Sequence, residues 1–260
     1  MTNASGRFAN LEVSRASGPA GPEGGVPIRD AAFYMRSGLA RELDGDHEKA
    51  LADYSAALGE NPLYIPAWAR QLWMLLYLGE TEEAAIWADR ALASFPNDPD
   101  LLALKSLARW RAGFPEEARR LNDAALAATR ESAEVWLARG GIQTASDVKS
   151  ANACFRHAAA VSREPGLAEM RAGDLLLLNG KPAEALSYCR EATLKLPDSA
   201  WAWYAYGLAQ RGLGRTGYAR SALIRAVNLN PRDPRYRAAL RRGRGWLSRL
   251  GEWLAKLGGR

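Results

Sequence analysis

This 260-residue sequence has few of the features that secreted, metal-binding and membrane-spanning proteins need. Its two cysteines, Cys154 and Cys189, are too few for a disulfide framework and lack a metal-ligand spacing. No apolar run is long enough for a membrane-spanning helix, and the N-terminus lacks the apolar core of a signal peptide. We therefore expect a soluble, cytoplasmic protein.

Patterns typical of catalysis and cofactor binding are also missing from the sequence. The two histidines, His47 and His157, have no carboxylate or thiol at a catalytic spacing. The sequence contains neither a phosphate-cradling Gly-Lys-Ser/Thr loop nor a dinucleotide-binding fingerprint. We expect no catalytic residues, no metal, no cofactor and no small-molecule substrate.

The net charge of +6 is concentrated at one end of the chain. Residues 232–260 contain nine Lys and Arg residues against two Asp and Glu residues, whereas residues 1–231 contain 26 basic and 27 acidic residues. Nucleic-acid binding proteins usually carry a basic stripe along the binding domain. Because the body of this chain is close to neutral, we do not expect a nucleic-acid partner.

A repeat of about 34 residues runs through the body of the sequence. It shows first in six alanines at intervals of 34, 34, 33, 34 and 34 residues. A second set of six alanines, seven residues later, keeps the same intervals, and glycines and prolines keep step with both sets. The first set is Ala50, Ala84, Ala118, Ala151, Ala185 and Ala219, and the second is Ala57, Ala91, Ala125, Ala158, Ala192 and Ala226.

A unit of this length holds two helices of ordinary length. Two alanines seven residues apart lie on one helix face and allow a neighbouring helix to approach closely. Glycines such as Gly45 and Gly79 are placed to end the first helix, because glycine readily adopts the left-handed conformation found there. Prolines such as Pro62 and Pro96 end the second helix.

The pattern resembles the tetratricopeptide repeat family over residues 31–231. Its first large position is occupied by Tyr34, Trp68, Leu102, Trp136, Glu169 and Trp203, and its small position by Gly38, Leu72, Ser106, Gly140, Gly173 and Gly207. The resemblance implies an all-α, right-handed superhelical solenoid of helix-turn-helix repeats with a C-terminal capping helix, and six repeats over residues 30–231. Irregular spacing between residues 130 and 166 suggests two three-repeat halves.

In this family the first helix of each repeat lines a concave groove that binds a peptide. The resemblance therefore implies a non-catalytic scaffold or adaptor with an aromatic-lined groove. Tryptophans at the first large position, Trp68, Trp136 and Trp203, are expected between helices instead. The implied groove residues are Met35, Leu39, Trp73, Tyr77, Leu107, Trp110, Arg111, Met170, Asp174, Trp201 and Tyr204.

The two ends of the chain differ from the repeats. Residues 1–27 are rich in Ser, Gly and Pro and are expected to be disordered. Residues 232–260 are expected to form a basic amphipathic helix that caps the last repeat. The alternative is a peripheral membrane scaffold, in which the second half of this helix contacts a membrane or a partner through Trp246, Leu250, Trp253 and Leu257.

Overall fold

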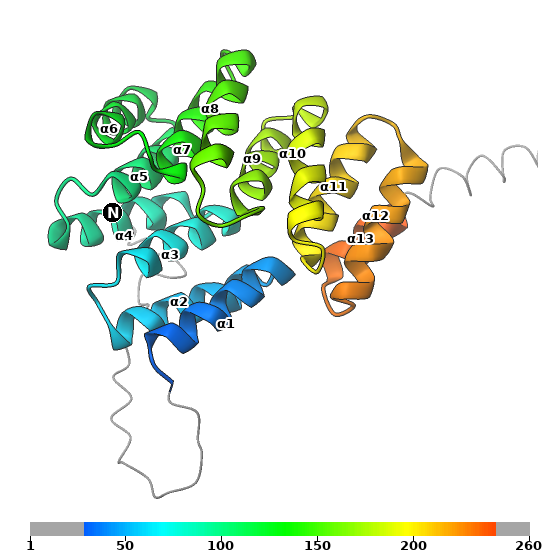
Figure 1. Cartoon of the computed structure of the whole chain (residues 1–260), viewed down its shortest axis with the longest axis horizontal. Coiled ribbons are helices and arrows are strands. Elements are labelled where there is room, and N and C mark those ends of the chain that lie inside the picture. Colours follow the sequence, from blue (N-terminus) through cyan, green and yellow to red (C-terminus); the bar gives the residue numbers. More distant parts are fainter. Residues whose placement is uncertain (1–28, 243–260) are drawn as a thin grey trace, which may run out of the picture. The chain divides into compact units, whose positions relative to one another are not determined.

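A computed structural model describes residues 29–242, and these residues confirm the all-α prediction (Figure 1). Within this range there are thirteen helices and no strand. The predicted N-terminal tail and the predicted contact residues Trp246, Leu250, Trp253 and Leu257 lie outside the described residues. The helices are α1 (Ala31–Asp44), α2 (His47–Glu60), α3 (Ile65–Leu78), α4 (Thr81–Ser94), α5 (Pro99–Arg111), α6 (Pro115–Ala128), α7 (Ala133–Gln143), α8 (Val148–Val161), α9 (Leu167–Leu178), α10 (Pro182–Lys195), α11 (Ala200–Gly212), α12 (Thr216–Leu229) and α13 (Pro234–Arg242).

The helices divide into two compact units. The first unit comprises residues up to 143 together with 149–161, and the second comprises 144–148 together with the residues from 162 onward. The first unit thus holds α1 to α7 and nearly all of α8, and the second holds α9 to α13. The division falls inside the irregular stretch 130–166, one repeat later than a split into two three-repeat halves.

Each repeat is a pair of helices joined by a tight turn, as the first pair shows. The carboxylate of Asp30 accepts a hydrogen bond from the backbone N–H of Phe33 at 2.7 Å and so caps the start of α1. Gly45 ends α1 with a φ of 82°, and its N–H donates to carbonyls of the last turn. Gly79 ends α3 in the same conformation, so the periodic glycines mark the turns as predicted.

Within a repeat, a small residue on the first helix receives a large side chain from the second. A Cβ placed on Gly38 of α1 would lie 2.6 Å from Cε1 of Tyr54 on α2, whose side chain is fully buried. In the next repeat the same register holds Leu72 and Ala88, both buried, with the large and small residues exchanged. The two facing positions therefore always combine one large and one small residue in these repeats. Their summed volume stays similar, as close packing requires.

The tryptophans at the first large position attach the preceding loop to the helix. The indole N–H of Trp68 donates to the carbonyl of Pro62 at 2.9 Å, and that of Trp203 donates to the carbonyl of Pro197 at 2.8 Å. Trp136 makes the same bond to the carbonyl of Arg130 at 2.8 Å, although proline is absent there. All three rings are half-buried, so they lie at the edge of the core rather than in its centre.

In the second unit, α13 covers the end of the sixth repeat. The ring of Tyr236 on α13 is fully buried in a cluster with Ala200 of α11 and Ala226 of α12. Asp233 caps the helix by accepting the N–H of Arg235 at 2.7 Å. This arrangement is the C-terminal capping helix that the sequence predicts, over its described part.

Candidate interaction site on the first helices

In the first unit, the face formed by α1, α3, α5 and α7 is the inner side of a curve. The indole N–H of Trp73 on α3 donates to a carboxylate oxygen of Glu134 on α7 at 2.6 Å, although the two residues are 61 positions apart. One whole repeat lies between these helices in the sequence. Side chains from alternate repeats can meet only where the stack curves toward them, which places this face on the inner side.

Trp73 itself is enclosed by the protein. Its side chain is 2% exposed, and its ring centroid lies 6.0 Å from that of Tyr77. A ligand could reach the indole only after the bond to Glu134 breaks. A direct role for Trp73 in ligand binding stays a prediction, and its role in holding α3 to α7 is what the geometry supports.

Tyr77, Trp110 and Arg111 are the half-buried members of the predicted groove in α3 and α5. The ring of Tyr77 stacks on His47 at 4.5 Å with an interplanar angle of 18°. The guanidinium of Arg111 donates to the carbonyl of Leu76 at 2.6 Å, which ties the end of α5 to α3. Burial lowers the pKa of Arg111, while the nearby Tyr77 opposes this shift.

The remaining apolar residues of the predicted groove differ in exposure. Leu107 and Met170 are each 1% exposed, so they belong to the interior of their units. Met35 is half-buried and packs against a cluster of Ala57, Leu58 and Ala67, and Leu39 is half-buried as well. Within the first unit, the side chains that a partner could contact without rearrangement are therefore Met35, Leu39, Tyr77, Trp110 and Arg111.

A buried polar network beside this face was not predicted as a site. Glu42 of α1 is fully buried and accepts hydrogen bonds from the hydroxyl of Tyr54 at 2.7 Å and from the guanidinium of Arg70 at 2.9 Å. These three residues join α1, α2 and α3. The repeat pattern gives little sign of the network: Arg36 and Arg171 share the register of Arg70, but no other repeat has a glutamate at the register of Glu42 or a tyrosine at that of Tyr54.

In the second unit, three aromatic side chains and one carboxylate form a single group. The indole N–H of Trp201 donates to the carboxylate of Asp174 at 2.7 Å, and the ring of Trp201 lies 5.3 Å from Tyr204. Tyr204 lies 4.9 Å from Tyr236 of α13. Trp201 and Tyr204 are half-buried, whereas Asp174 is 6% exposed, so the aromatic rings are the accessible part.

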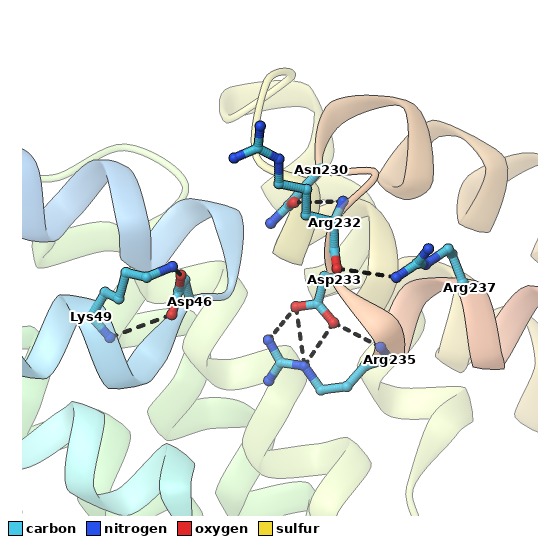
Figure 2. A network of polar contacts seen from close by, with 7 residues as sticks. All are labelled: Asp46, Lys49, Asn230, Arg232, Asp233, Arg235 and Arg237. Carbon is cyan, nitrogen blue, oxygen red and sulfur yellow. Dashed lines mark hydrogen bonds and ion pairs between the residues drawn. The ribbon is translucent and has the colours of Figure 1, made fainter.

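Arg235 of α13 completes this group. Its guanidinium lies 5.2 Å from the centre of the Trp201 ring and forms an ion pair with Asp233 at 2.5 Å. Burial raises the pKa of Asp233, but the hydrogen bonds and charge of Arg235 outweigh this effect and hold it below the ordinary value. Figure 2 shows Asp233 turned toward this guanidinium.

The turn before α13 is held by its own polar contacts. Figure 2 shows the side chain of Asn230 accepting the backbone N–H of Arg232 at 3.3 Å, and Arg237 donating to the carbonyl of Arg232 at 3.3 Å. The same figure shows, in the first unit, Lys49 paired with Asp46 at the start of α2. These contacts order helix starts and leave the guanidinium of Arg232 at the surface.

Among residues 29–242, no group of His, Cys, Asp and Glu side chains is arranged to hold a metal ion. Within the same range, no helix combines the length and apolarity needed to cross a bilayer. The thiol of Cys189 is buried, and burial raises its pKa well above the ordinary value, with the charge of Asp174 adding to the shift.

Comparison with known sequences decides the family. Two tetratricopeptide repeat models match the chain, one over residues 44–99 and 143–200 and the other over residues 176–243. The chain belongs to the tetratricopeptide repeat family. This tetratricopeptide repeat protein also matches an uncharacterized protein of Methanocaldococcus jannaschii with 38% identity over 66 residues, which are 25% of this chain and 77% of that protein.

Solved structures show the same fold. A chain of the APC/C hetero-tetramer Cut9-Hcn1 aligns with a TM-score of 0.51 and 16% identity, covering 83% of this chain and 43% of that chain. A tetratricopeptide repeat protein from Parabacteroides merdae aligns with a TM-score of 0.51 and 17% identity, covering 82% and 84% of the two chains. This chain thus spans less than half the length of the first. The family and fold identify a repeat scaffold for protein interaction.

Proposed function

We propose that this tetratricopeptide repeat protein is a non-catalytic adaptor that binds an extended peptide or a helix of another protein on its first-helix face. The observation that carries the proposal is the presence, in each unit, of half-buried aromatic side chains on the first helices: Tyr77 and Trp110 in the first unit, and Trp201 and Tyr204 in the second. Rigid aromatic side chains bury large areas with little loss of conformational entropy, which suits them to recognition.

The polar groups of the face support a peptide as the ligand. Arg111 and Arg235 lie beside the aromatic rings, and each keeps part of its surface exposed. An arginine next to an aromatic ring can bind a carboxylate or a backbone carbonyl while the ring packs on an apolar side chain. Each unit by itself therefore offers both apolar and hydrogen-bonding contacts.

The test uses a displayed peptide library against the full-length protein and a Tyr77→Ala, Trp110→Ala variant. We expect the selected peptides to bind the variant at least tenfold more weakly, because truncating such anchors typically costs more than about 1 kcal/mol each. A Leu63→Ala, Phe114→Ala variant is the matched control, since these residues are 69% and 45% exposed at loops outside the face. Equal loss in both variants, or no loss in the first, contradicts the proposal.

A second candidate function is docking on a membrane surface through the C-terminal segment. The sequence after α13 contains Trp246, Leu250, Trp253 and Leu257 with interspersed basic residues, a composition typical of interfacial segments. Flotation of the full-length protein with liposomes, compared with a Trp246→Ala, Trp253→Ala variant, tests this function. No flotation of the full-length protein would remove the candidate.

A further inference from the structure

The last two described helices present an arginine-rich surface that the first-helix face does not include. Between residues 211 and 242 the sequence contains nine arginines, one aspartate, and neither lysine nor glutamate. The positive charge thus begins in the sixth repeat, before the C-terminal helix. Its exposed side chains, which we call the arginine surface, are Arg215, Arg220, Arg225, Arg232, Arg237 and Arg241.

The described residues neutralise little of this charge. Asp233 is paired with Arg235, which lies beside the aromatic group of the site described above. Arg225 approaches Asp198 at 3.7 Å, but the Asp198 side chain is 89% exposed, and such pairs contribute little. Within residues 29–242, no other ion pair involves a member of the arginine surface.

A capping role alone does not require this composition. The end of a repeat array has to be polar, because no further repeat covers it. Arg220 occupies the position that Leu51 and Ala85 occupy in the first two repeats, where both are buried. In the last repeat this position is exposed, so an arginine there meets the requirement for a polar end. Solubility is served equally well by charges of both signs, so six exposed arginines with a single exposed acidic partner, Asp198, need another explanation.

Apolar side chains lie among the arginines on α12. Ile224 is 39% exposed and Tyr218 is 69% exposed. With 3.6 residues per turn, Ile224 lies between Arg220 and Arg225 around the helix, and Tyr218 lies on the Arg225 side. Exposed aliphatic and aromatic groups flanked by cations are typical of surfaces that rest on lipid headgroups.

We propose that the arginine surface binds the phosphate groups of an anionic phospholipid membrane, with Tyr218 and Ile224 entering the headgroup layer. Guanidinium groups form bidentate hydrogen bonds to phosphate, and basic residues next to a membrane anchor strengthen binding to anionic lipids. The inference rests on the membrane function proposed above, because the sequence after α13 carries the tryptophans and leucines. It assigns the lipid selectivity to folded residues of α12 and α13.

The test is co-sedimentation of the full-length protein with vesicles of phosphatidylcholine alone and of phosphatidylcholine mixed with phosphatidylglycerol. The test variant is Arg220→Gln, Arg225→Gln, Arg237→Gln. The control variant is Arg36→Gln, Arg120→Gln, Arg156→Gln. It removes three exposed arginines of the first unit and therefore has the same net charge as the test variant. Circular dichroism and thermal melting establish that both variants are folded.

We expect the test variant to lose on the order of a hundredfold in affinity for the anionic vesicles, at about fivefold for each arginine. The control variant should bind like the unmodified protein, and added salt should weaken binding because it screens exposed charges. Equal binding to both kinds of vesicle, or equal affinities of the two variants, overturns the inference and leaves membrane docking in place. Absence of binding to any vesicle overturns both the inference and the membrane-docking function. If the protein then binds an acidic polypeptide or DNA in a way that depends on these arginines, the surface has a different partner.

Discussion

The close contact between Gly38 and Tyr54 allows a quantitative prediction for Gly38→Ala. The new methyl group would lie 2.6 Å from Cε1, 2.9 Å from Cδ1 and 3.0 Å from Cζ of the Tyr54 ring. The ring has little freedom to move, because it is fully buried and its hydroxyl donates to Glu42 at 2.7 Å. Overpacking of this kind costs about 1–3 kcal/mol, and alanine returns up to about 1 kcal/mol through its higher helix propensity.

We therefore expect Gly38→Ala to lower the free energy of unfolding of the first unit by about 1–2 kcal/mol. Urea unfolding followed by circular dichroism measures this change. Gly217→Ala is the matched control, because a Cβ there has no neighbour within 4 Å, and the substitution should stabilise α12 by up to about 1 kcal/mol.

A Tyr54→Ala background separates the clash from other effects, and alanine is the residue found at this register in the next repeat, Ala88. Removing the ring removes its contact with residue 38, so Gly38→Ala should then become neutral or stabilising, as at Gly217. The coupling between the two substitutions should fall in the range of about 0.5–3 kcal/mol found for residues in contact. If Gly38→Ala raises stability in the unmodified protein, the reasoning about volume-matched pairs is wrong.

Two further predictions follow from polar contacts. Arg70→Met should destabilise the first unit by about 3–5 kcal/mol, because it removes the guanidinium that pairs with the buried Glu42 carboxylate. Urea unfolding measures the loss, and a change below about 1 kcal/mol would contradict this prediction. The depressed pKa of Asp233 contributes stability that is fully present above its ordinary value of 3.8 and is lost as pH falls through the lower folded value. The protection factors of the α13 amides, measured by hydrogen exchange relative to the intrinsic exchange rate at each pH, should therefore fall at acid pH. Asp233→Asn should abolish that acid-dependent change and cost at most about 1 kcal/mol at neutral pH, since Arg235 is partly exposed; an unchanged pH dependence would contradict the assignment.

The sequence alone determined the helix pairs, their order and their turns. Alanines, glycines and prolines at 34-residue intervals recur because every repeat must make the same close approach and the same turn. Gly45 and Gly79 end their helices in the left-handed conformation as predicted, and Asp233 caps α13. Such features depend on neighbouring residues in the chain, so a sequence pattern contains them.

Which side chains on the first helices are accessible was decided only by the tertiary structure. Trp73 and Trp110 are both expected in the groove from the sequence, yet Trp73 is 2% exposed and bonded to Glu134, while Trp110 is half-buried. The difference arises from the curvature of the first unit, which brings α3 to α7 across a whole repeat. Curvature sums small offsets over many packing contacts, and no single residue or interval in the sequence encodes that sum.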